Sequence, residues 1–412
     1  MSTATVILAA GQGSRMKSDL PKVLHKIADA PMLWHTMQCA AEIEADQTIV
    51  VVGHGGEETS NAAHEYNAEA KIVWQTEQNG TGHAVLQAKA ELENFDGDVI
   101  VLYGDTPFVQ PETLRKMLTA RAQSSVVVLG FKAENPGGYG RLKMNGDSLE
   151  AIIEAKDCTP EQLEITFCNS GVICAPAPLL FSLLGEVGND NANGEVYLTD
   201  IIAIARNRDL HCTAITCPEA ETMGINSRQN LADAEAVFQQ SARAAAMENG
   251  VTLIAPDTVH FAFDTHIGRD TIIEPNVFFG LAVTIESGAT IRAFSHLEGC
   301  HVARKCVVGP YARLRPGAEL DLGAKVGNFV EIKAAQIEAG AKVNHLTYVG
   351  DARVGEGSNI GAGTIFCNYD GVNKHHTEIG KRVFIGSNSA LVAPVSIADE
   401  AFVATGSVVT AD

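Results

Sequence analysis

A bulky aliphatic or aromatic residue returns at every sixth position, with a few phase slips, between Ile267 and Val409. This period fits neither an α-helix, which repeats every 3.6 residues, nor a simple strand, which alternates every two. Six residues form one side of a triangular coil, so the pattern predicts a parallel β-helix of hexapeptide repeats, with about eight coils. The positions are Ile267, Ile273, Phe279, Ile285, Ile291, Leu297, Val302, Val308, Leu314, Leu320, Val326, Ile332, Ile337, Val343, Val349, Val354, Ile360, Phe366, Ile379, Ile385, Leu391, Ile397, Val403 and Val409.

Glycine directly follows many of these apolar residues. A corner of the coil can require backbone conformations that only glycine adopts easily, and we expect the glycines to serve that purpose. They are Gly268, Gly309, Gly327, Gly350, Gly355, Gly361, Gly380 and Gly386.

The formal net charge of −20 bears on the choice of partners. Nucleic acids and anionic membranes repel an acidic surface, so neither is an expected partner. Small anionic ligands remain possible where cations cluster, as they do at Arg15, Lys17, Lys22 and Lys26 and again at 304–333. The nine cysteines lack metal-ligand spacing, and we expect buried, reduced thiols in a cytoplasmic protein. No apolar run resembles a signal peptide or a membrane span.

The N-terminal half alternates apolar runs with amphipathic segments. The runs are rich in β-branched residues, as buried parallel strands are, and the alternation predicts a Rossmann-like α/β domain with its ligand site at the carboxyl ends of the strands. The predicted organisation is a domain at 1–226, a linker helix at 227–250 and the β-helix at 251–412. We expect strands at 5–9, 48–52, 71–74, 98–103 and 125–129, and helices at 32–43, 83–92, 111–122 and 227–249.

A glycine-containing turn follows the first predicted strand. Residues 11–16 read Gly-Gln-Gly-Ser-Arg-Met, and Pro21-Lys22 come soon after. Backbone N–H groups in such a turn can close on a phosphate. The dinucleotide fingerprint fails because Met16 replaces its third glycine, and a P-loop fails because no Gly-Lys-Ser/Thr follows. A glycine turn with two cations suits a triphosphate.

These residues, with Gln75, the segment 80–84 and the segment 103–107, resemble the signature of the sugar-phosphate nucleotidyltransferases. Combined with a hexapeptide β-helix, the whole chain resembles the bacterial family of bifunctional N-acetylglucosamine-1-phosphate uridylyltransferases and glucosamine-1-phosphate acetyltransferases. Its members carry a left-handed parallel β-helix. The resemblance implies uridylyl transfer from UTP to N-acetylglucosamine 1-phosphate, with Mg²⁺ and release of pyrophosphate. It also implies a cytoplasmic homotrimer that serves peptidoglycan and lipopolysaccharide synthesis.

The resemblance assigns roles in the N-terminal domain. Arg15 and Lys22 would offset phosphate charge, Asp105 and Asn226 would hold Mg²⁺, and Gln75 and Thr81 would face the uracil. Residues implied to bind UTP or UDP-N-acetylglucosamine are Leu8, Ala9, Gly11, Gly13, Lys22, Gln75, Gly80, Thr81, Tyr103, Asp105, Gly140, Glu154, Asn169 and Asn226.

The β-helix would transfer an acetyl group from acetyl-CoA to glucosamine 1-phosphate. An amine attacks a thioester only after losing its proton, and histidine is a suitable base near neutral pH. By resemblance His345 is that base, and we expect Glu331, fourteen residues earlier, to orient its ring. The implied sugar-phosphate contacts are Arg315, Lys333, Tyr348 and Asn359, and the implied acetyl-CoA contacts are Ala362, Asn368, Tyr369, Ser387 and Thr405.

Two departures from the family pattern concern acetyl-CoA. The family continues into a tail with a basic residue that closes the acetyl-CoA site, whereas this sequence stops at Asp412. We therefore expect weakened acetyl-CoA binding. Thr405 stands where the family often has alanine, and a backbone contact is expected there.

Three alternatives stay open at this point. The β-helix could serve only assembly or regulation beside a nucleotidyltransferase for another sugar phosphate. The chain could be a non-catalytic interaction protein built on the same two folds. The β-helix could also resemble the γ-class carbonic anhydrases, with zinc held by some of His296, His301, His345, His375 and His376.

Overall fold

The computed structural model describes residues 2–189 and 194–411. Its internal contacts divide the chain into two compact units, Met1–Ala234 and Glu235–Asp412. The division falls inside the long helix α8, Arg228–Glu248. No helix among the described residues is long and apolar enough to cross a membrane.

The first unit is built on a mixed sheet with the strand order β11-β7-β10-β6-β1-β4-β5. Its centre is parallel, because β1 pairs in parallel with both β4 and β6, as the predicted α/β class requires. The long strand β10 runs antiparallel to β6 and β7, and the hairpin β8–β9 extends from it; neither was predicted. The strands are β1 Thr3–Ala9, β4 Gln47–Val52, β5 Lys71–Trp74, β6 Asp98–Tyr103, β7 Val126–Lys132, β8 Arg141–Asn145, β9 Ser148–Ile153, β10 Phe167–Pro176 and β11 Cys212–Cys217.

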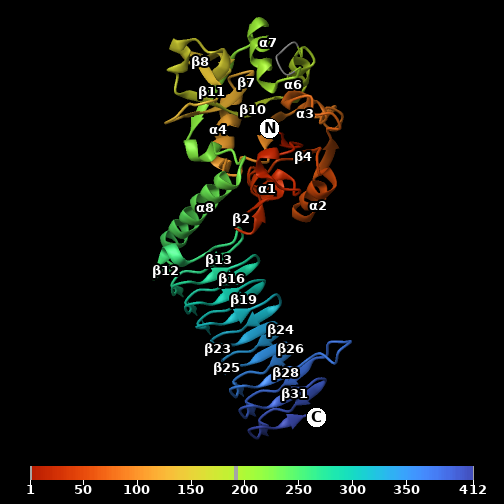
Figure 1. The fold of residues 1–412 in the computed structure, drawn as a ribbon, viewed down its shortest axis with the longest axis vertical. Helices are drawn as coiled ribbons and strands as arrows, with labels where there is room; N and C mark the ends of the chain where they lie inside the picture. Colours follow the sequence, from red (N-terminus) through yellow and green to blue (C-terminus); the bar gives the residue numbers. More distant parts are fainter. Residues whose placement is uncertain (1, 190–193, 412) are drawn as a thin grey trace. The chain divides into compact units, whose positions relative to one another are not determined.

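Helices cover both faces of this sheet, and each face has its own apolar core (Figure 1). Successive residues of a strand point to opposite faces, so Val6 packs in one core and Ile7 in the other. This two-sided burial explains why the strands are continuous apolar runs. The helices are α1 Met32–Glu42, α2 Gly56–Tyr66, α3 Thr81–Leu86, α4 Pro111–Arg121, α6 Ala177–Leu184 and α7 Ile201–Asn207.

The second unit is the predicted β-helix, with coils that stack through parallel strands (Figure 1). One face carries nine strands, one more than the eight predicted coils, because the stack already begins at Thr252. These strands are β12 Thr252–Leu253, β14 Ile272–Ile273, β17 Thr290–Ile291, β20 Val307–Val308, β23 Lys325–Asn328, β25 Lys342–His345, β27 Asn359–Ile360, β30 Phe384–Ile385 and β33 Phe402–Val403.

The other faces form one continuous sheet, since several strands bend across a corner. Residues 368–376 leave the stack as a projecting loop (Figure 1). The strands are β13 His266–Ile267, β15 Phe278–Phe279, β16 Val283–Ile285, β18 His296–Leu297, β19 Cys300–Val302, β21 Arg313–Leu314, β22 Ala318–Leu320, β24 Glu331–Ile337, β26 Tyr348–Val354, β28 Ile365–Cys367, β29 Thr377–Ile379, β31 Ala390–Val392, β32 Val395–Ile397 and β34 Val408–Val409.

The glycines after the hexad residues serve a different purpose from the one predicted. Gly309 alone among them has a positive φ. A Cβ on Gly327 would lie 2.0 Å from the carbonyl oxygen of Asn344, and one on Gly386 would lie 2.4 Å from the backbone nitrogen of Thr405. These positions need glycine because the next coil passes too close for any side chain.

The nine cysteines are all unpaired, and seven are buried. Burial raises the pKa of Cys39, Cys217 and Cys300 to about 12, which keeps them as unreactive thiols. The expectation of burial was wrong for Cys158 and Cys367, which are partly exposed.

Strand β14 offers a test of the inward-facing core. Ile273 is fully buried in the β-helix core, whereas its neighbour Ile272 is 41% exposed. We expect Ile273→Ala to lower the free energy of unfolding of the β-helix by about 2–5 kcal/mol, because it leaves a cavity. The matched Ile272→Ala should cost less than about 1 kcal/mol. Urea unfolding measures both, and equal losses would contradict the assigned direction of the two side chains.

Candidate nucleotide and acetyl-transfer sites

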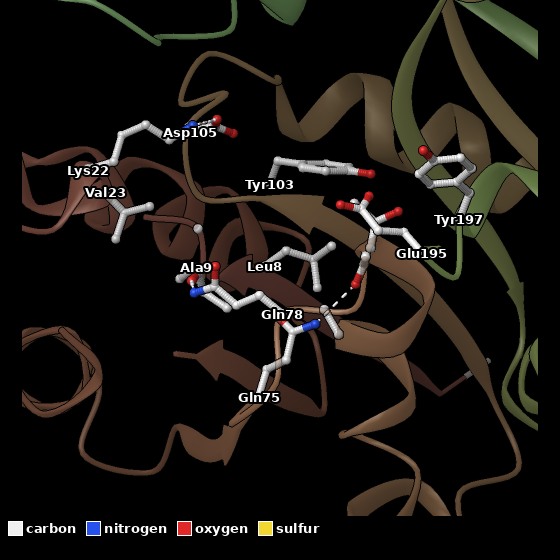
Figure 2. A pocket seen from close by; sticks show the side chains of 15 residues that line it. Leu8, Ala9, Lys22, Val23, Gln75, Gln78, Tyr103, Asp105, Glu195 and Tyr197 are labelled. Carbon is white, nitrogen blue, oxygen red and sulfur yellow. Dashed lines mark hydrogen bonds and ion pairs between the residues drawn. The ribbon is translucent and has the colours of Figure 1, made fainter. Parts of the chain in front are cut away.

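A cavity of about 290 Å³ opens at the carboxyl ends of the central strands of the first unit. Leu8 and Ala9 end β1, Tyr103 ends β6, and Gln75 directly follows β5 (Figure 2). Nine of the predicted nucleotide-site residues line this cavity: Leu8, Ala9, Gly11, Lys22, Gln75, Gly80, Thr81, Tyr103 and Asp105.

Lys22 connects the polar groups at one end of the cavity. Its ammonium forms an ion pair with the carboxylate of Asp105 (Figure 2), and it donates to Oδ1 of Asn226 at 3.1 Å. Arg15 donates to the same Oδ1 at 2.9 Å. The four residues, scattered over more than 200 positions in the sequence, therefore form one cluster.

The approach to helix α8 explains how Asn226 is available for this cluster. Ser227 precedes the first helical residue, and its Oγ accepts from the backbone N–H of Asn230 at 3.1 Å, which is the N-cap contact. Asn226 therefore need not cap the helix, and its side-chain oxygen turns to Arg15 and Lys22.

Gly13 sets the position of Lys22. Its φ of 61° lies in the left-handed region, and a Cβ here would stand 2.6 Å from Cβ of Lys22. Glycine is thus required by both conformation and space. In contrast, a Cβ on Gly11 would meet nothing within 4 Å, and Gly11 lines the open cavity.

The opposite wall carries neutral hydrogen-bonding groups. Gln75 is nearly fully buried, and its Nε2 donates to the carbonyl of Gly80 at 3.0 Å. The Oγ1 of Thr81 accepts from the backbone N–H of Leu198 at 3.1 Å. These are the residues that the family resemblance assigned to the base.

Tyr103 lies near Glu154, one of the predicted UDP-N-acetylglucosamine contacts that do not line the cavity. Burial raises the pKa of its phenol, with Asp105 and Glu154 adding to the effect through their charges, so the hydroxyl stays a neutral hydrogen-bonding group. Gly140 accepts from the backbone N–H of Asn169 at 2.8 Å, which places these two predicted residues side by side.

Six lining residues were not predicted: Ala10, Val23, Gln78, Ala84, Glu195 and Tyr197. Gln78 donates to the carbonyl of Ala10 at 3.0 Å. Glu195 and Tyr197 come from a segment held over the start of α3, where Gly82 donates to the carbonyl of Val196 at 2.8 Å. This contact spans more than 110 residues, and no sequence motif marks it.

The predicted acetyl-transfer residues of the second unit fall into groups, the first of which surrounds Tyr348. Asn368 hydrogen-bonds to the Tyr348 hydroxyl at 3.4 Å and to the carboxylate of Asp351. The neighbouring ammonium of Lys333 lowers the pKa of Lys374, so the loop brings a second, unpredicted cation to Lys333. Predicted contact Tyr369 lies on the same loop and is 60% exposed.

His345 lies in a second group. Its Nδ1 is 2.7 Å from Oδ1 of Asn328, with which it is in register on the adjacent coil. The expected contact with Glu331 is wrong for this chain, because Glu331 pairs with Arg315 at 2.8 Å. Since an amide oxygen only accepts, Nδ1 carries the hydrogen and Nε2 keeps a free lone pair. Asn359 follows His345 on the same face of the coil.

The predicted acetyl-CoA contacts Ala362, Ser387 and Thr405 lie on successive coils. Ala362 accepts from the backbone N–H of Asn388 at 2.8 Å, and Ser387 accepts from that of Gly406 at 2.8 Å. The Thr405 backbone passes directly beside Gly386. The three positions therefore form a short column along one corner.

The histidines considered for zinc do not gather. His375 pairs with Asp370 at 2.7 Å, His376 with Glu378 at 3.3 Å, and His296 stacks on Phe278. Among residues 2–189 and 194–411, no three His, Cys, Asp or Glu side chains form a metal-binding group.

Comparison with known proteins agrees with both parts of the chain. Residues 5–182 match the family model of the MobA-like NTP transferase domain, and residues 377–411 match that of the hexapeptide repeat of succinyl-transferase. These matches define a nucleotidyltransferase joined to a hexapeptide-repeat acyltransferase.

Full-length relatives identify the family. The chain is 64% identical over 412 residues to the bifunctional protein GlmU of Ruegeria sp. (strain TM1040), a match that covers 100% of this chain and 92% of the relative. It is 59% identical over 409 residues to the bifunctional protein GlmU of Jannaschia sp. (strain CCS1), and this match covers 99% of this chain and 90% of the relative. It is 63% identical over 412 residues to the bifunctional protein GlmU of Ruegeria pomeroyi, and this match covers 100% of this chain and 92% of the relative. The chain belongs to the family of bifunctional GlmU proteins, and the family predicted from the sequence is confirmed.

Gly171 tests the packing of Tyr103. Its φ is +91°, and a Cβ here would lie 2.8 Å from the Tyr103 ring. We expect Gly171→Ala to lower the free energy of unfolding of the first unit by about 1–3 kcal/mol, through backbone strain and displacement of the ring. Gly138→Ala, where a Cβ meets nothing within 4 Å, is the control and should change it by less than about 0.5 kcal/mol. Thermal unfolding gives both values. An unchanged Gly171→Ala protein would refute this packing argument.

Proposed function

We propose that the first unit makes UDP-N-acetylglucosamine and that the second acetylates glucosamine 1-phosphate, with the roles below for individual residues. The observation that carries the proposal is the cluster of Arg15, Lys22, Asp105 and Asn226 at one end of a cavity whose other wall carries the hydrogen-bonding side chains of Gln75 and Thr81. The cations of the cluster suit a triphosphate, and the hydrogen-bonding groups of the other wall suit a nucleotide base. Membership of a bifunctional family supports the pairing of two reactions in one chain.

In uridylyl transfer, a phosphate oxygen of N-acetylglucosamine 1-phosphate attacks the α-phosphorus of UTP. The bond to the bridging oxygen breaks, and pyrophosphate leaves with the electron pair. Negative charge is spread over phosphoryl oxygens during this step, so positioning and electrostatic stabilisation dominate catalysis. Lys22 and Arg15 supply positive charge, and Gln75 and Thr81 hold the uracil. The neutral Tyr103 hydroxyl hydrogen-bonds to Thr81, and we assign the sugar to the neighbouring Glu154.

We propose Asp105 and Asn226 as protein ligands of Mg²⁺. Their side-chain oxygens both contact one ammonium, that of Lys22, so they already converge on a cation. Carboxylate and amide oxygens are hard ligands of the kind that Mg²⁺ prefers, and Mg²⁺ characteristically uses few protein ligands beside water and substrate phosphates. The bound ion would supply charge neutralisation at the phosphates.

For acetyl transfer, the Nε2 lone pair of His345 accepts a proton from the amine of glucosamine 1-phosphate. The amine nitrogen forms a bond to the thioester carbonyl carbon of acetyl-CoA. The bond from that carbon to sulfur breaks, and CoA leaves as the thiolate with the electron pair and takes up the proton from His345. Asn328 holds the ring in the tautomer that leaves Nε2 free. We assign the sugar 1-phosphate to Arg315 and Lys333, with Tyr348 and Asn359 on the sugar and Ala362, Asn368, Tyr369, Ser387 and Thr405 on acetyl-CoA.

We further propose a homotrimer in the cytoplasm. The rings of Phe294, Tyr311 and Phe329 stack on successive coils, with centroids 4.9 and 5.2 Å apart, and all three are about half exposed. Leu346, 60% exposed, continues this column. A contiguous apolar strip of this kind favours a protein partner, and a neighbouring β-helix would bring its own residues to the acetyl-transfer groups.

Asp105→Asn separates the two reactions. It removes a charge beside Lys22 and a proposed Mg²⁺ ligand, so we expect pyrophosphate release from UTP to fall by roughly a hundredfold or more. Acetyl transfer, followed by release of the CoA thiol, should be unchanged. Asp147→Asn is the control, since that side chain is 90% exposed. Wild-type pyrophosphate release from the Asp105 variant would exclude the proposed role.

His345→Ala tests the second reaction. Loss of the base should lower the rate of CoA thiol release by roughly 10²- to 10⁴-fold while pyrophosphate release persists. His376→Ala serves as the control, because that ring is 59% exposed and pairs with Glu378 at 3.3 Å. Acetyl transfer within about threefold of wild type in the His345 variant would rule out His345 as the base.

A further inference from the structure

The amide of Gln75 is held from behind by a side chain that does not line the cavity. Its Nε2 lies 3.0 Å from the carbonyl oxygen of Gly80 and 3.1 Å from Nδ1 of His83. An amide nitrogen has two hydrogens, and these two acceptors use both. Gln75 is 5% exposed and lines the cavity, so Oε1 is the part of the amide left to face a bound base.

This arrangement requires His83 to offer Nδ1 as an acceptor. A neutral imidazole has one acceptor nitrogen, and Gln87 approaches the other nitrogen, Nε2, at 3.2 Å. Gln87 also donates to the His83 carbonyl at 3.0 Å, and it is partly exposed, so its remaining hydrogen can reach water. The buried Gln75 has no such alternative. The hydrogen on the ring therefore belongs on Nε2, and Nδ1 accepts from Gln75. Gln87 then makes no hydrogen bond to the ring and keeps only its bond to the His83 carbonyl.

We propose that His83 is a positioning residue that selects uracil over cytosine by fixing the Gln75 amide. The inference rests on the proposed function, in which Gln75 faces the base. Uracil has a hydrogen on N3, whereas cytosine has a lone pair there. An outward Oε1 accepts from uracil N3–H and repels the cytosine lone pair. If the Gln75 amide were flipped by 180°, its Nε2 would face the base and would favour cytosine. That flip would place Oε1 against the Gly80 carbonyl oxygen and remove the hydrogen bond to His83.

The test compares His83→Leu with His83→Asn. Leucine removes the acceptor, whereas the amide oxygen of asparagine can stand close to the position of Nδ1 and restore it. We measure kcat/KM for UTP and for CTP by pyrophosphate release with N-acetylglucosamine 1-phosphate. We expect the UTP-to-CTP ratio to fall at least about tenfold in His83→Leu and to stay within about threefold of wild type in His83→Asn. A change in stability alone would not move this ratio.

Two results would overturn the proposal: an unchanged ratio in His83→Leu, or an equal fall in both variants. His83→Ala repeats the comparison if the leucine variant does not fold. Gln87→Leu is the control, because Gln87 contacts His83 but is not bonded to Gln75, and its ratio should match wild type. Failure of the wild-type protein to release pyrophosphate from UTP would instead refute the proposed function, and this result is independent of the variants.

Discussion

Parallel strand pairing with a fixed register is the constraint on which both sites depend. In the first unit, β1 lies between β4 and β6, and Leu8 pairs with Tyr103 at their carboxyl ends. Loops that are distant in sequence therefore begin at one edge of the sheet and enclose one cavity. In the β-helix, register repeats coil by coil, so Asn328 pairs with His345 and Glu331 with Tyr348. A slip by one residue would turn each of these side chains to the other face.

Periodicity predicted more of this molecule than local motifs did. Of the 24 hexad residues, 21 are buried in the β-helix core, and Ile267, Val403 and Val409 pack against it partly buried. The six-residue period marks one inward-pointing bulky side chain on each side of a coil. The antiparallel strand β10 and the hairpin β8–β9 were missed, since short mixed segments carry no period that distinguishes them from loops. Glu195 and Tyr197 were missed because a tertiary contact to α3 places them.

The residue at a position was easier to predict than the physical reason why it is required there. Glycine was expected after the hexads for its backbone freedom, yet Gly327 is required because the neighbouring coil passes too close. A partner for His345 was expected about one coil away, and one is present. It is the neutral Asn328, because Glu331 lies on another side of the coil, where it neutralises Arg315. The sequence spacing predicts which coil carries the partner residue. The side of the coil on which that residue lies decides whether the two side chains meet.

In each site, an asparagine amide, which does not titrate, contacts a charged or reactive side chain. Oδ1 of Asn226 binds both Lys22 and Arg15, and Oδ1 of Asn328 binds the His345 ring. In a chain with a net charge of −20, a carboxylate at either place would add negative charge where phosphates must bind. An amide oxygen orients the same groups without neutralising them. Arg15 therefore keeps its charge for the phosphates, whereas Lys22 is also paired with Asp105. The imidazole of His345 is held in one tautomer by a group whose own charge does not change with pH.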